Sequence, residues 1–586
     1  MILFLFLFVS VGQCKEEEKD NVWVLQVAPG HDMKILAREL GLTYLHPIPS
    51  PPLKQMYAFS HASGSGRFDA SQVSLAADAH PAVQWHERQV KRQQVKRGEG
   101  VFYPTDPLFG AQWHLHPNSP VKLTASECWT RGASSRGQGA VVSIVDDGLQ
   151  HAHPDLKLGY EARLSHDYNS EDSDPSPGRG DGHGTSAAGV AAGRANNGVC
   201  GLGVCPECKV AGVRLIAGPS SDYMEAMGLS HGVDSVSVYS NSWGPPDDGE
   251  TMEGPGKVTL AALEQNTQQG RGGKGSIYVW AGGNGATAHD DGNYDGYANS
   301  RFTVTVGAVA HDGKRAYYSE PCACLMVTAP SSGQRGYGIT TIDLIGSDGY
   351  SAGDCTNDFG GTSSAAPAAA GAIGLLLGFK PELTRRDVLM LLAKTSSRLV
   401  DRANRDWTPL NGRGISHNHE YGWGMIDPAA LLNAASAFEA GQTKPELVCS
   451  TGKIALGLVI GDGTGEMSFP MELPNVACVR SSTSVPPASS IDYVEYVEVR
   501  VWLSHRRRGD LVIRLSDPHG VVSRLATPHA DNEPGYKNGA GWTFGSARHW
   551  GQTFSGVWTL FLGDMVRNGR TGILDAYEIV VRGHKE

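Results

Sequence analysis

Residues 141–148 read Val-Val-Ser-Ile-Val-Asp-Asp-Gly, an apolar, β-branched run that ends in two carboxylates and a glycine. Short runs of the same kind follow at 276–280 and 302–309, and glycine-rich turns and helical stretches separate them. Continuous apolar strands that alternate with helices are typical of a parallel sheet covered by helices on both faces. We therefore predict an α/β domain built around the strand at 140–145.

The last quarter of the chain has a different pattern. The chain has 586 residues, enough for several domains, and its composition (40% hydrophobic, 19% charged) excludes disordered and collagen-like proteins. From about residue 443, strand-like runs such as 493–504 and 577–581 are separated by turn residues. This pattern predicts an all-β module of sandwich or jelly-roll type.

The N-terminus indicates a secreted protein. Residues 1–11 are nearly all Leu, Ile, Phe and Val, a run shorter than the roughly 20 apolar residues that span a bilayer. They fit the apolar region of a signal peptide, which we place at 1–14. The apolar run at 365–379 is broken by Pro367 and rich in Ala and Gly, so we interpret it as buried core. The mature chain should therefore lack a transmembrane segment.

The negative charge lies in the middle of the chain. The formal net charge is −11, which makes a nucleic-acid partner a poor match. Residues 98–440 hold 37 acidic and 24 basic residues, a net −13, whereas 15–97 are net +2 and 441–586 are neutral. Two interpretations stay open: a solvated acidic surface, or a site for cations such as metals or Lys and Arg side chains.

The ten cysteines fit an oxidising compartment. Cys205 and Cys208 form a Cys-Pro-Glu-Cys motif, and Cys322 and Cys324 form a Cys-Ala-Cys motif. Disulfides are the favoured interpretation for these four, with pairing between the two motifs as one hypothesis. A redox motif or a zinc site is the alternative. Cys128 is expected to be a free buried thiol.

Three motifs carry the residues of a nucleophilic site in the order Asp, His, Ser. Asp146 ends the strand, His183 precedes a run of small residues, and Ser363 opens a helix in the motif Gly-Thr-Ser-Ser-Ala-Ala-Pro. A serine at a helix start alone is usually an N-cap, but the three motifs together are a strong signal. The carboxylate would hold the imidazole tautomer, and the imidazole would take the serine proton.

A fourth motif adds an oxyanion donor. Residues 279–285 read Val-Trp-Ala-Gly-Gly-Asn-Gly, which puts Asn284 at a glycine-rich strand end. Its side-chain amide and the N–H of Ser363 at a helix N-terminus would stabilise a developing oxyanion.

Four further stretches narrow the family. They are Ser-Trp-Gly-Pro-Pro-Asp-Asp-Gly at 242–249, Asn-Tyr-Asp-Gly-Tyr at 293–297, Ala-Asn-Asn-Gly-Val-Cys-Gly at 195–201 and Arg-Arg-Gly-Asp-Leu at 507–511. With them the sequence resembles the subtilisin-like serine proteases, and among these the kexin/furin-like proprotein convertases, over nearly the whole chain.

The resemblance implies a four-part organisation. A signal peptide (1–14) would precede an inhibitory α/β prodomain (15–97), a subtilisin-like peptidase domain (98–442) and a β-barrel P domain (443–586). It implies a calcium-dependent endoprotease that cleaves precursor proteins after Lys-Arg or Arg-Arg. Cleavage of the chain after Lys96-Arg97, at the bond between Arg97 and Gly98, would produce the mature enzyme. We expect a monomer in the lumen of the secretory pathway, in the Golgi or beyond it.

The same resemblance implies a function for the excess of acidic residues. Between Asp222 and Asp295 lie 11 acidic and 3 basic residues. The residue before the cleaved bond, P1, would be an Arg held by Asp247, Asp295 and the carbonyls of Pro245 and Ala281. A P2 Lys would face Asp147 and Asp181. A P4 Arg would meet Glu225, Glu253 and Tyr297.

Other oxygen ligands imply calcium, which takes six to eight of them. The resemblance implies three sites, with these ligands: Asp106, Asp155 and Asn197 with the carbonyls of Arg194, Val199 and Gly201 at the first; Asp247, Asp290 and Glu320 at the second; Asp167, Asp172 and Asp174 at the third. A solvated loop is the alternative for the third cluster.

The resemblance also implies disulfides and a pH sensor. Cys200–Cys355 and Cys449–Cys478 match family bridges, whereas glycine at position 292 removes the family's partner for Cys322. His61 lies near the family's acid-sensing histidine, and we hypothesise that its protonation loosens the prodomain. An ordinary exposed histidine is the alternative. The Arg-Gly-Asp triplet at 508–510 could bind integrins, but a structural role within the P domain is favoured.

Two other functions compete with the first. One is a degradative subtilase of broader specificity, and the other is an inactive scaffold that binds through its P domain. The presence of Asp146, His183, Ser363 and Asn284 argues against the scaffold.

Overall fold

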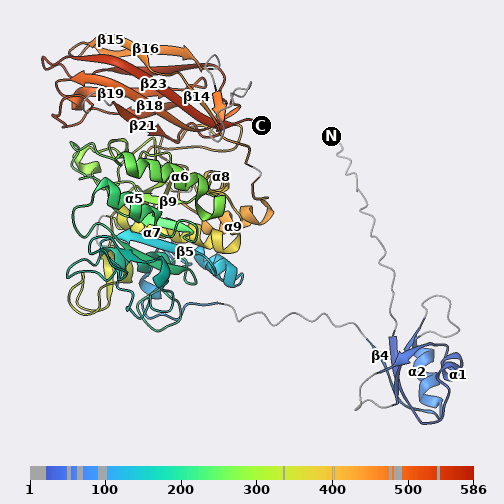
Figure 1. Cartoon of the computed structure of the whole chain (residues 1–586). Coiled ribbons are helices and arrows are strands. Elements are labelled where there is room, and N and C mark those ends of the chain that lie inside the picture. The colour runs from blue at the N-terminus through green and yellow to red at the C-terminus, as the bar shows by residue number, and fades with distance from the viewer. Residues whose placement is uncertain are drawn as a thin grey trace, which may run out of the picture. The chain divides into compact units, whose positions relative to one another are not determined.

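The computed structural model describes residues 22–48, 55–61, 70–89, 102–333, 337–398, 400–401, 403–441, 443–473, 478–480, 491–536 and 541–586. The chain divides into two compact units, Met1–Gly100 and Val101–Glu586 (Figure 1). The signal peptide predicted at 1–14 and the cleavage site predicted at Lys96-Arg97 lie outside the described residues.

The first unit is a small α/β fold. Its elements are β1 (Val22–Val27), α1 (Met33–Glu39), β2 (Thr43–Pro47), β3 (Met56–Ser60), α2 (Ala70–Ala79) and β4 (Val83–Gln89). The antiparallel sheet has the order β2-β3-β1-β4. Trp23, Leu25 and Val27 alternate into one buried face of β1, as expected for a sheet covered on one side. His61 follows β3 and is buried, so the exposed-histidine alternative is wrong.

The second unit begins with a parallel seven-stranded sheet of order β11-β10-β9-β8-β5-β7-β6, as the strand pattern predicted. Its strands are β5 (Val141–Asp146), β6 (His166–Asp167), β7 (Lys209–Arg214), β8 (Val238–Asn241), β9 (Tyr278–Ala281), β10 (Thr303–Val309) and β11 (Val327–Pro330). Every residue of β5 is buried, because the sheet is covered on both faces.

Helices pack on both faces of this sheet. The helices are α3 (Ala125–Trp129), α4 (His183–Ala192), α5 (Asp222–Ser230), α6 (Lys257–Gly273), α7 (Thr362–Phe379), α8 (Arg385–Thr395) and α9 (Pro428–Ala437). Short 3-10 turns cover Phe109–Ala111, Ala133–Arg136, Ala162–Leu164, Ala286–Ala288, Gly292–Tyr294 and Arg508–Asp510. A hairpin, β12 (Ile339–Ile342) and β13 (Cys355–Phe359), lies beside α4.

Helix α7 forms the centre of one face. It contacts strands β5 and β8 to β11, and nearly all of its residues are buried. Among the described residues it is the one helix long and apolar enough to cross a membrane. Its burial against the sheet confirms the interpretation as core and places the helix N-terminus at the carboxyl edge of the strands.

The P domain is a sandwich of two antiparallel sheets, ordered β17-β14-β23-β18-β21 (with β15 also paired to β23) and β16-β22-β19-β20. Its strands are β14 (Leu447–Ser450), β15 (Ile454–Ile460), β16 (Gly465–Glu472), β17 (Cys478–Arg480), β18 (Tyr493–His505), β19 (Leu511–Ser516), β20 (Val522–Ala526), β21 (Trp542–Ser546), β22 (Val557–Asp564) and β23 (Gly572–His584). Alternate residues of β18 and β22 fill the space between the sheets, as the all-β pattern predicted.

The sandwich packs against the peptidase domain beside α6 and α8 (Figure 1). Arg386 of α8 donates from Nε to Oε2 of Glu495 on β18 at 3.0 Å. The P-domain core also contains peptidase side chains, namely Met252, Tyr294 and Ala323. The two domains therefore share one hydrophobic core at their junction.

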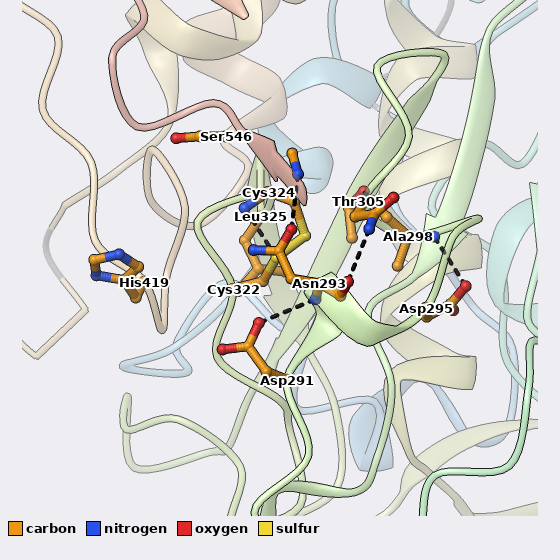
Figure 2. The surroundings of a disulfide bond; sticks show 12 residues. Asp291, Asn293, Asp295, Ala298, Thr305, Cys322, Cys324, Leu325, His419 and Ser546 are labelled. Atoms are coloured by element: carbon orange, nitrogen blue, oxygen red, sulfur yellow. Dashed lines mark hydrogen bonds between the residues drawn. A yellow bond between two sulfur atoms is a disulfide. The ribbon is translucent and has the colours of Figure 1, made fainter. Parts of the chain in front are cut away.

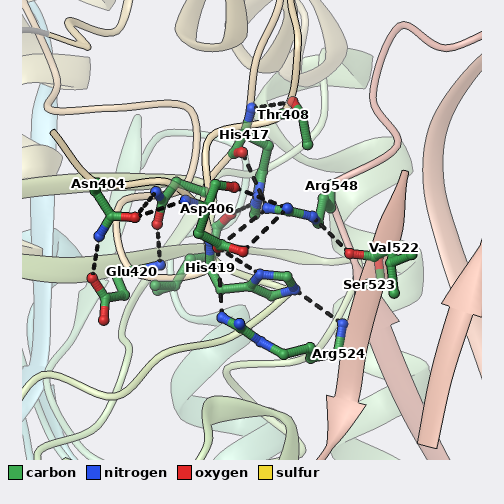
Figure 3. Close-up of polar contacts among 12 residues, drawn as sticks. Asn404, Asp406, Thr408, His417, His419, Glu420, Val522, Ser523, Arg524 and Arg548 are labelled. Atoms are coloured by element: carbon green, nitrogen blue, oxygen red, sulfur yellow. Dashed lines mark hydrogen bonds and ion pairs between the residues drawn. The ribbon is translucent and has the colours of Figure 1, made fainter. Parts of the chain in front are cut away.

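A second polar contact between the domains surrounds Asp406 (Figure 3). Arg548 of the P domain donates to Oδ1 of Asp406 at 3.3 Å and to the carbonyl of His417 at 3.1 Å. His419 places Nδ1 2.7 Å from Asp406, and its Nε2 accepts the backbone N–H of Arg524 at 3.0 Å. Burial and the nearby Arg548 lower the pKa of His419 to about 3, so the ring is neutral and can accept that bond.

Candidate active site

Asp146 and His183 meet at the carboxyl edge of the parallel sheet. Asp146 is the last residue of β5, and His183 is the first residue of α4. Nδ1 of His183 lies 2.8 Å from Oδ1 of Asp146, whose side chain is 1% exposed. The described residues offer no partner to the buried Oδ2 of Asp146. A carboxylate held this way fixes the imidazole tautomer with its proton on Nδ1.

The same carboxylate controls the basicity of the histidine. Burial alone lowers the pKa of His183, but the charge of Asp146 and the hydrogen bond to it outweigh burial and raise that pKa above its ordinary value. An imidazole of raised basicity at the start of a helix is suited to take a proton from a hydroxyl group.

Asp147 has a structural function that its sequence position did not reveal. Its Oδ2 accepts the N–H of His183 at 3.2 Å, and its Oδ1 accepts the N–H of Gly184 at 2.8 Å. These bonds cap the first turn of α4 and fix the histidine backbone. Burial and the neighbouring Asp146 raise the pKa of Asp147 to about 7. The side chain is half-buried beside His183.

Ser363 lies in the first turn of the 18-residue helix α7. It lines a pocket of about 340 Å³ together with Asp247, Asn284 and Asp295. Asn284 Oδ1 accepts the N–H of Thr362 at 2.7 Å, and Asn284 Nδ2 donates to Asp247 at 3.3 Å. The nucleophile candidate, the amide and both predicted P1 acids therefore share one cavity.

The two predicted P1 acids, Asp247 and Asp295, have raised pKa values. Burial raises the pKa of Asp295 to about 7, although its Oδ1 accepts the N–H groups of Tyr297 (2.7 Å) and Ala298 (3.2 Å). Burial also raises the pKa of Asp247. Gly244 leaves room for Asp295, since a Cβ there would lie 2.8 Å from Oδ2. Pro245 and Ala281 also line the cavity. Carboxylates with raised pKa values gain strongly from a cationic ligand.

The residues proposed for P4 divide into two groups. Glu225 on α5 accepts the hydroxyl proton of Tyr297 at 2.6 Å, so these two lie together. Glu253 instead contacts the segment that carries Asp295 through its backbone, since its carbonyl accepts the N–H of Gly296 at 2.7 Å. Tyr297 stacks on Trp280 with ring centres 5.0 Å apart.

Asp181 does not face the cleft as an isolated acid. Its Oδ2 forms an ion pair with Nη2 of Arg214 at 3.2 Å and accepts the N–H of Gly178. Arg214 also pairs with Oδ2 of Asp167 at 2.8 Å. The positive charge of Arg214 therefore offsets Asp181, which weakens its candidacy for P2 recognition.

Two of the three expected calcium sites keep suitable oxygen ligands together. At the first, Asn197 donates from Nδ2 to Asp155 at 2.7 Å and from its backbone to Asp106 at 3.1 Å. Burial raises the pKa of Asp155 to about 7. At the second, burial raises the pKa of Asp290 to about 6, and burial with the charges of Asp290 and Asp247 raises the pKa of Glu320 well above its ordinary value.

Carboxylates alone do not complete either site. No three His, Cys, Asp or Glu side chains in the described part of the chain converge closely enough to bind a metal by themselves. Calcium accepts backbone carbonyls and water as ligands, so both oxygen-rich sites suit calcium only with such additional oxygens.

The third expected site does not fit calcium. Asp167 uses Oδ2 for Arg214 and Oδ1 for the N–H groups of Asn169 (2.7 Å) and Ser170 (2.9 Å). Asp174 accepts bonds from Ser176 and His151, and Asp172 accepts the N–H of Asp174. Each carboxylate has its own local partner, so the prediction of calcium there is not supported.

The described residues contain four disulfides. Cys200–Cys355 and Cys449–Cys478 are the pairs that the resemblance implied. Cys205–Cys208 and Cys322–Cys324 close within their own motifs, so pairing between the motifs and a zinc site are both wrong. Figure 2 shows the second of these bridges beside Asn293. A Cβ at Gly292 would lie 3.5 Å from Sγ of Cys322, as expected where a family bridge is missing.

Cys128 and the Arg-Gly-Asp triplet are structural. Cys128 is free and buried, and burial raises the pKa of its thiol to about 12, which keeps it unreactive. Arg508 and Asp510 are buried, with Arg508 bound to Asp531. An integrin could not reach this triplet.

A second Asp–His–Ser arrangement lies inside the P domain. Ser523 Oγ is 2.8 Å from His549 Nε2, and His549 Nδ1 is 3.1 Å from Asp517 Oδ2. All three side chains are buried in the sandwich, so no peptide can reach them. Sequence reasoning missed this network because no motif joins its members.

Comparison with known proteins gives the family. Residues 137–424 match the subtilase family, and residues 494–581 match the proprotein convertase P-domain. Proprotein convertase subtilisin/kexin type 4 of Homo sapiens is 36% identical over 578 residues, which cover 96% of this chain and 72% of that protein. This chain is a proprotein convertase of the subtilase family. The convertase is therefore a serine endopeptidase of the processing type.

Other relatives agree. The dibasic-processing endoprotease of Schizosaccharomyces pombe is 34% identical and covers 100% of the convertase and 82% of its own length. Human furin is 36% identical over 86% of the convertase and 61% of furin. The solved serine protease of Aeromonas sobria has a TM-score of 0.68 at 21% identity, covering 84% of the convertase and 99% of that chain, which shows a shared fold.

Proposed function

We propose that the convertase is a calcium-dependent endoprotease that cleaves precursor proteins after Lys-Arg or Arg-Arg. One observation carries this: Ser363, Asp247 and Asp295 line the same cavity of about 340 Å³. A nucleophile that shares a cavity with two carboxylates, the half-buried Asp295 and the exposed Asp247, suits a substrate whose P1 side chain carries a guanidinium, which binds carboxylates through a rigid fork of donors.

The catalytic roles follow from the contacts of the site. Ser363 attacks the carbonyl carbon of the scissile bond while His183 takes the hydroxyl proton on Nε2, since Nδ1 faces Asp146. The imidazolium then protonates the leaving amine, and water repeats the sequence to release the acyl group. Asn284 and the N–H of Ser363 stabilise the oxyanion, for which Asn284 Nδ2 exchanges its contact with Asp247 for the substrate oxygen.

Substrate residues before P1 would meet a series of acids. Asp147 faces a P2 Lys, with a smaller contribution from Asp181 because Arg214 offsets its charge. Glu225, Tyr297 and Glu253 receive a P4 Arg. The acid-rich middle block of the chain supports this selection of basic peptides.

Calcium would be held at two places. The first set is Asp106, Asp155 and Asn197 with the carbonyls of Arg194, Val199 and Gly201, and the second is Asp247, Asp290 and Glu320. When bound, the ion supplies positive charge that offsets the repulsion among buried carboxylates.

The chain would contain its own inhibitor. Residues 1–14 are proposed as the signal peptide, 15–97 as the prodomain, 98–442 as the peptidase domain and 443–586 as the P domain. The basic Lys96-Arg97 tail of the prodomain matches the enzyme's own acidic cleft, which supports autocleavage before Gly98. His61 would act as the acid sensor of this prodomain. We place the mature monomer in the Golgi lumen or outside the cell.

A peptide panel tests the function. Matched fluorogenic peptides with Lys-Arg, single Arg or Phe before the cleaved bond are compared with and without chelator, with Ser363→Ala as control. We expect cleavage after Lys-Arg at least about 100-fold faster than after Phe, and loss of activity in chelator. Equal rates on Phe and Lys-Arg would favour a degradative subtilase and refute the proposal.

A further inference from the structure

Both chain segments that carry the P1 acids touch the P domain. Met252 follows Asp247 by five residues, and Tyr294 precedes Asp295 directly. Both side chains are at most 3% exposed and belong to the P-domain hydrophobic core. Asn293 and Tyr294 of the Asn-Tyr-Asp-Gly-Tyr motif contact the P domain, whereas Tyr297 of the same motif contacts Glu225 and Trp280.

The first contact is with strand β21. Oδ1 of Asn293 accepts the N–H of Gly545 at 2.8 Å, and its carbonyl accepts Nε1–H of Trp542 at 2.9 Å. Asn299 donates from Nδ2 to the carbonyl of Thr543 at 2.9 Å. Strand β21 ends its sheet, so these groups occupy its outer edge. Figure 2 shows Asn293 and Asp295 on this segment.

The residues that form these hydrogen bonds lie on both sides of Asp295 in the sequence. Asn293 lies two residues before Asp295, and Asn299 lies four residues after it. Tyr294 adds a stacked contact with His529, with ring centres 4.6 Å apart, and its hydroxyl donates to the carbonyl of Thr527 at 3.2 Å. The backbone around Asp295 is therefore attached to the P domain on both sides.

The second contact is a single arginine. Arg508 donates from Nη2 to the carbonyl of Glu250, three residues after Asp247, and from Nε to Asp531. Arg508 is 5% exposed and Asp531 is fully buried. Asp531 is itself held by the N–H of Glu533 at 2.8 Å. The loop that carries the other P1 acid is therefore anchored to the same sandwich.

We propose that the P domain sets the spacing of Asp247 and Asp295, with Arg508, Asn293 and Trp542 as positioning residues for P1 specificity. The proposal rests on the proposed function. Two carboxylates that line one cavity repel each other, and two anchors on one rigid sandwich oppose their separation. Binding of a P1 Arg depends on that spacing because its guanidinium is a rigid planar fork of donors. Binding of a P1 Lys depends on the spacing less, because its ammonium lies on a flexible side chain.

The first test compares neighbouring arginines in the full chain. Arg508→Gln removes the donor to Glu250, whereas Arg507→Gln removes an ion pair to Asp510 that lies wholly within the P domain (2.9 Å). Peptides ending in Lys-Arg or Lys-Lys are cleaved by enzyme quantified by active-site titration. For Arg508→Gln we expect KM for the Arg peptide to rise about 10-fold with kcat within about 3-fold, and the Arg-to-Lys ratio of kcat/KM to fall at least about 5-fold. Arg507→Gln should keep the ratio within about twofold of wild type.

The second test uses a milder pair of variants. Trp542→Phe keeps a ring but removes the donor to Asn293, whereas Trp502→Phe changes a tryptophan whose ring lies under Lys453. We expect Trp542→Phe to lower the Arg-to-Lys ratio about 2- to 5-fold and Trp502→Phe to leave it unchanged. This pair decides the question if Arg508→Gln does not fold.

The outcomes separate the two proposals. Failure of the wild-type enzyme to cleave the Lys-Arg peptide overturns the proposed function itself. The second outcome is an active wild type whose Arg-to-Lys ratio is unchanged in Trp542→Phe, and also in Arg508→Gln if that variant folds. This result overturns only the role of the P domain in P1 specificity.

Discussion

Asp295→Asn should make the convertase more stable and less active. The carboxylate is half-buried in the proposed P1 pocket, and its Oδ1 accepts the N–H groups of Tyr297 and Ala298. An asparagine keeps the size and that acceptor but loses the negative charge. The substitution therefore tests charge at this position with little change of shape.

The loss of activity can be estimated from the lost charge pair. Removing one partner of a buried, hydrogen-bonded charge pair costs about 2–5 kcal/mol. Expressed as kcat/KM for a P1 Arg peptide, this is a fall of roughly 30- to 5,000-fold. A peptide with citrulline at P1, which has the same shape without the charge, should lose much less.

The gain in stability follows from the pKa of the carboxyl group. Burial raises the pKa of Asp295 from 3.8 to about 7 in the folded enzyme, so the folded state retains the proton to higher pH than the unfolded chain. The contribution of Asp295 to wild-type stability therefore declines as pH rises from 3.8 through 7, whereas the asparagine does not titrate. The advantage of Asp295→Asn should grow from under about 1 kcal/mol at pH 4 to about 4 kcal/mol at pH 7.

Two measurements check these signs. Kinetics use both peptides with titrated enzyme, and urea unfolding at pH 4 and pH 7 uses a Ser363→Ala background with chelator to prevent autolysis. Asp248→Asn is the matched control, since Asp248 is an exposed acid that accepts turn N–H groups from Glu250 and Thr251. An unchanged preference for Arg over citrulline in Asp295→Asn, or lower stability at pH 7, would refute the reasoning.

Three further substitutions test other parts of the site. Asp146→Asn should lower kcat by on the order of 10⁴ and move the acid limb of the pH–rate profile to lower pH, because the lost carboxylate no longer raises the pKa of His183. Glu495→Gln should lower the free energy of unfolding in urea by about 3 kcal/mol above pH 4.5. The reason is that the charge partners of Glu495, Arg386 foremost, overcome burial and hold its pKa at about 2. The difference in stability between variant and wild type should vanish as pH falls from 4.5 to 2. In Asp155→Asn, the calcium concentration that produces a given increase in Tm should be at least about tenfold higher than in the wild type. If variant and wild type respond equally to calcium, the first calcium site is contradicted.

Much of the candidate site was readable from the sequence because its residues lie in short continuous motifs. The strand that ends at Asp146 is apolar throughout, which predicts burial and a parallel sheet. The order of the acid, histidine and serine motifs then predicts a meeting point at the carboxyl edge of that sheet, where His183 lies 2.8 Å from Asp146. The alternating pattern after residue 443 likewise predicts the sandwich.

The sequence by itself determined which residues carry chemistry, because local pattern decides strands, helix starts and the acids next to them. Only the tertiary structure decided their partners. Arg214 binds both Asp167 and Asp181, although it lies 47 and 33 residues away from them, and so changes the interpretation of both acids. Arg508 reaches the carbonyl of Glu250 across 258 residues. Such contacts depend on how distant elements pack, and no local pattern encodes which charge will be neutralised and which will remain in the cleft.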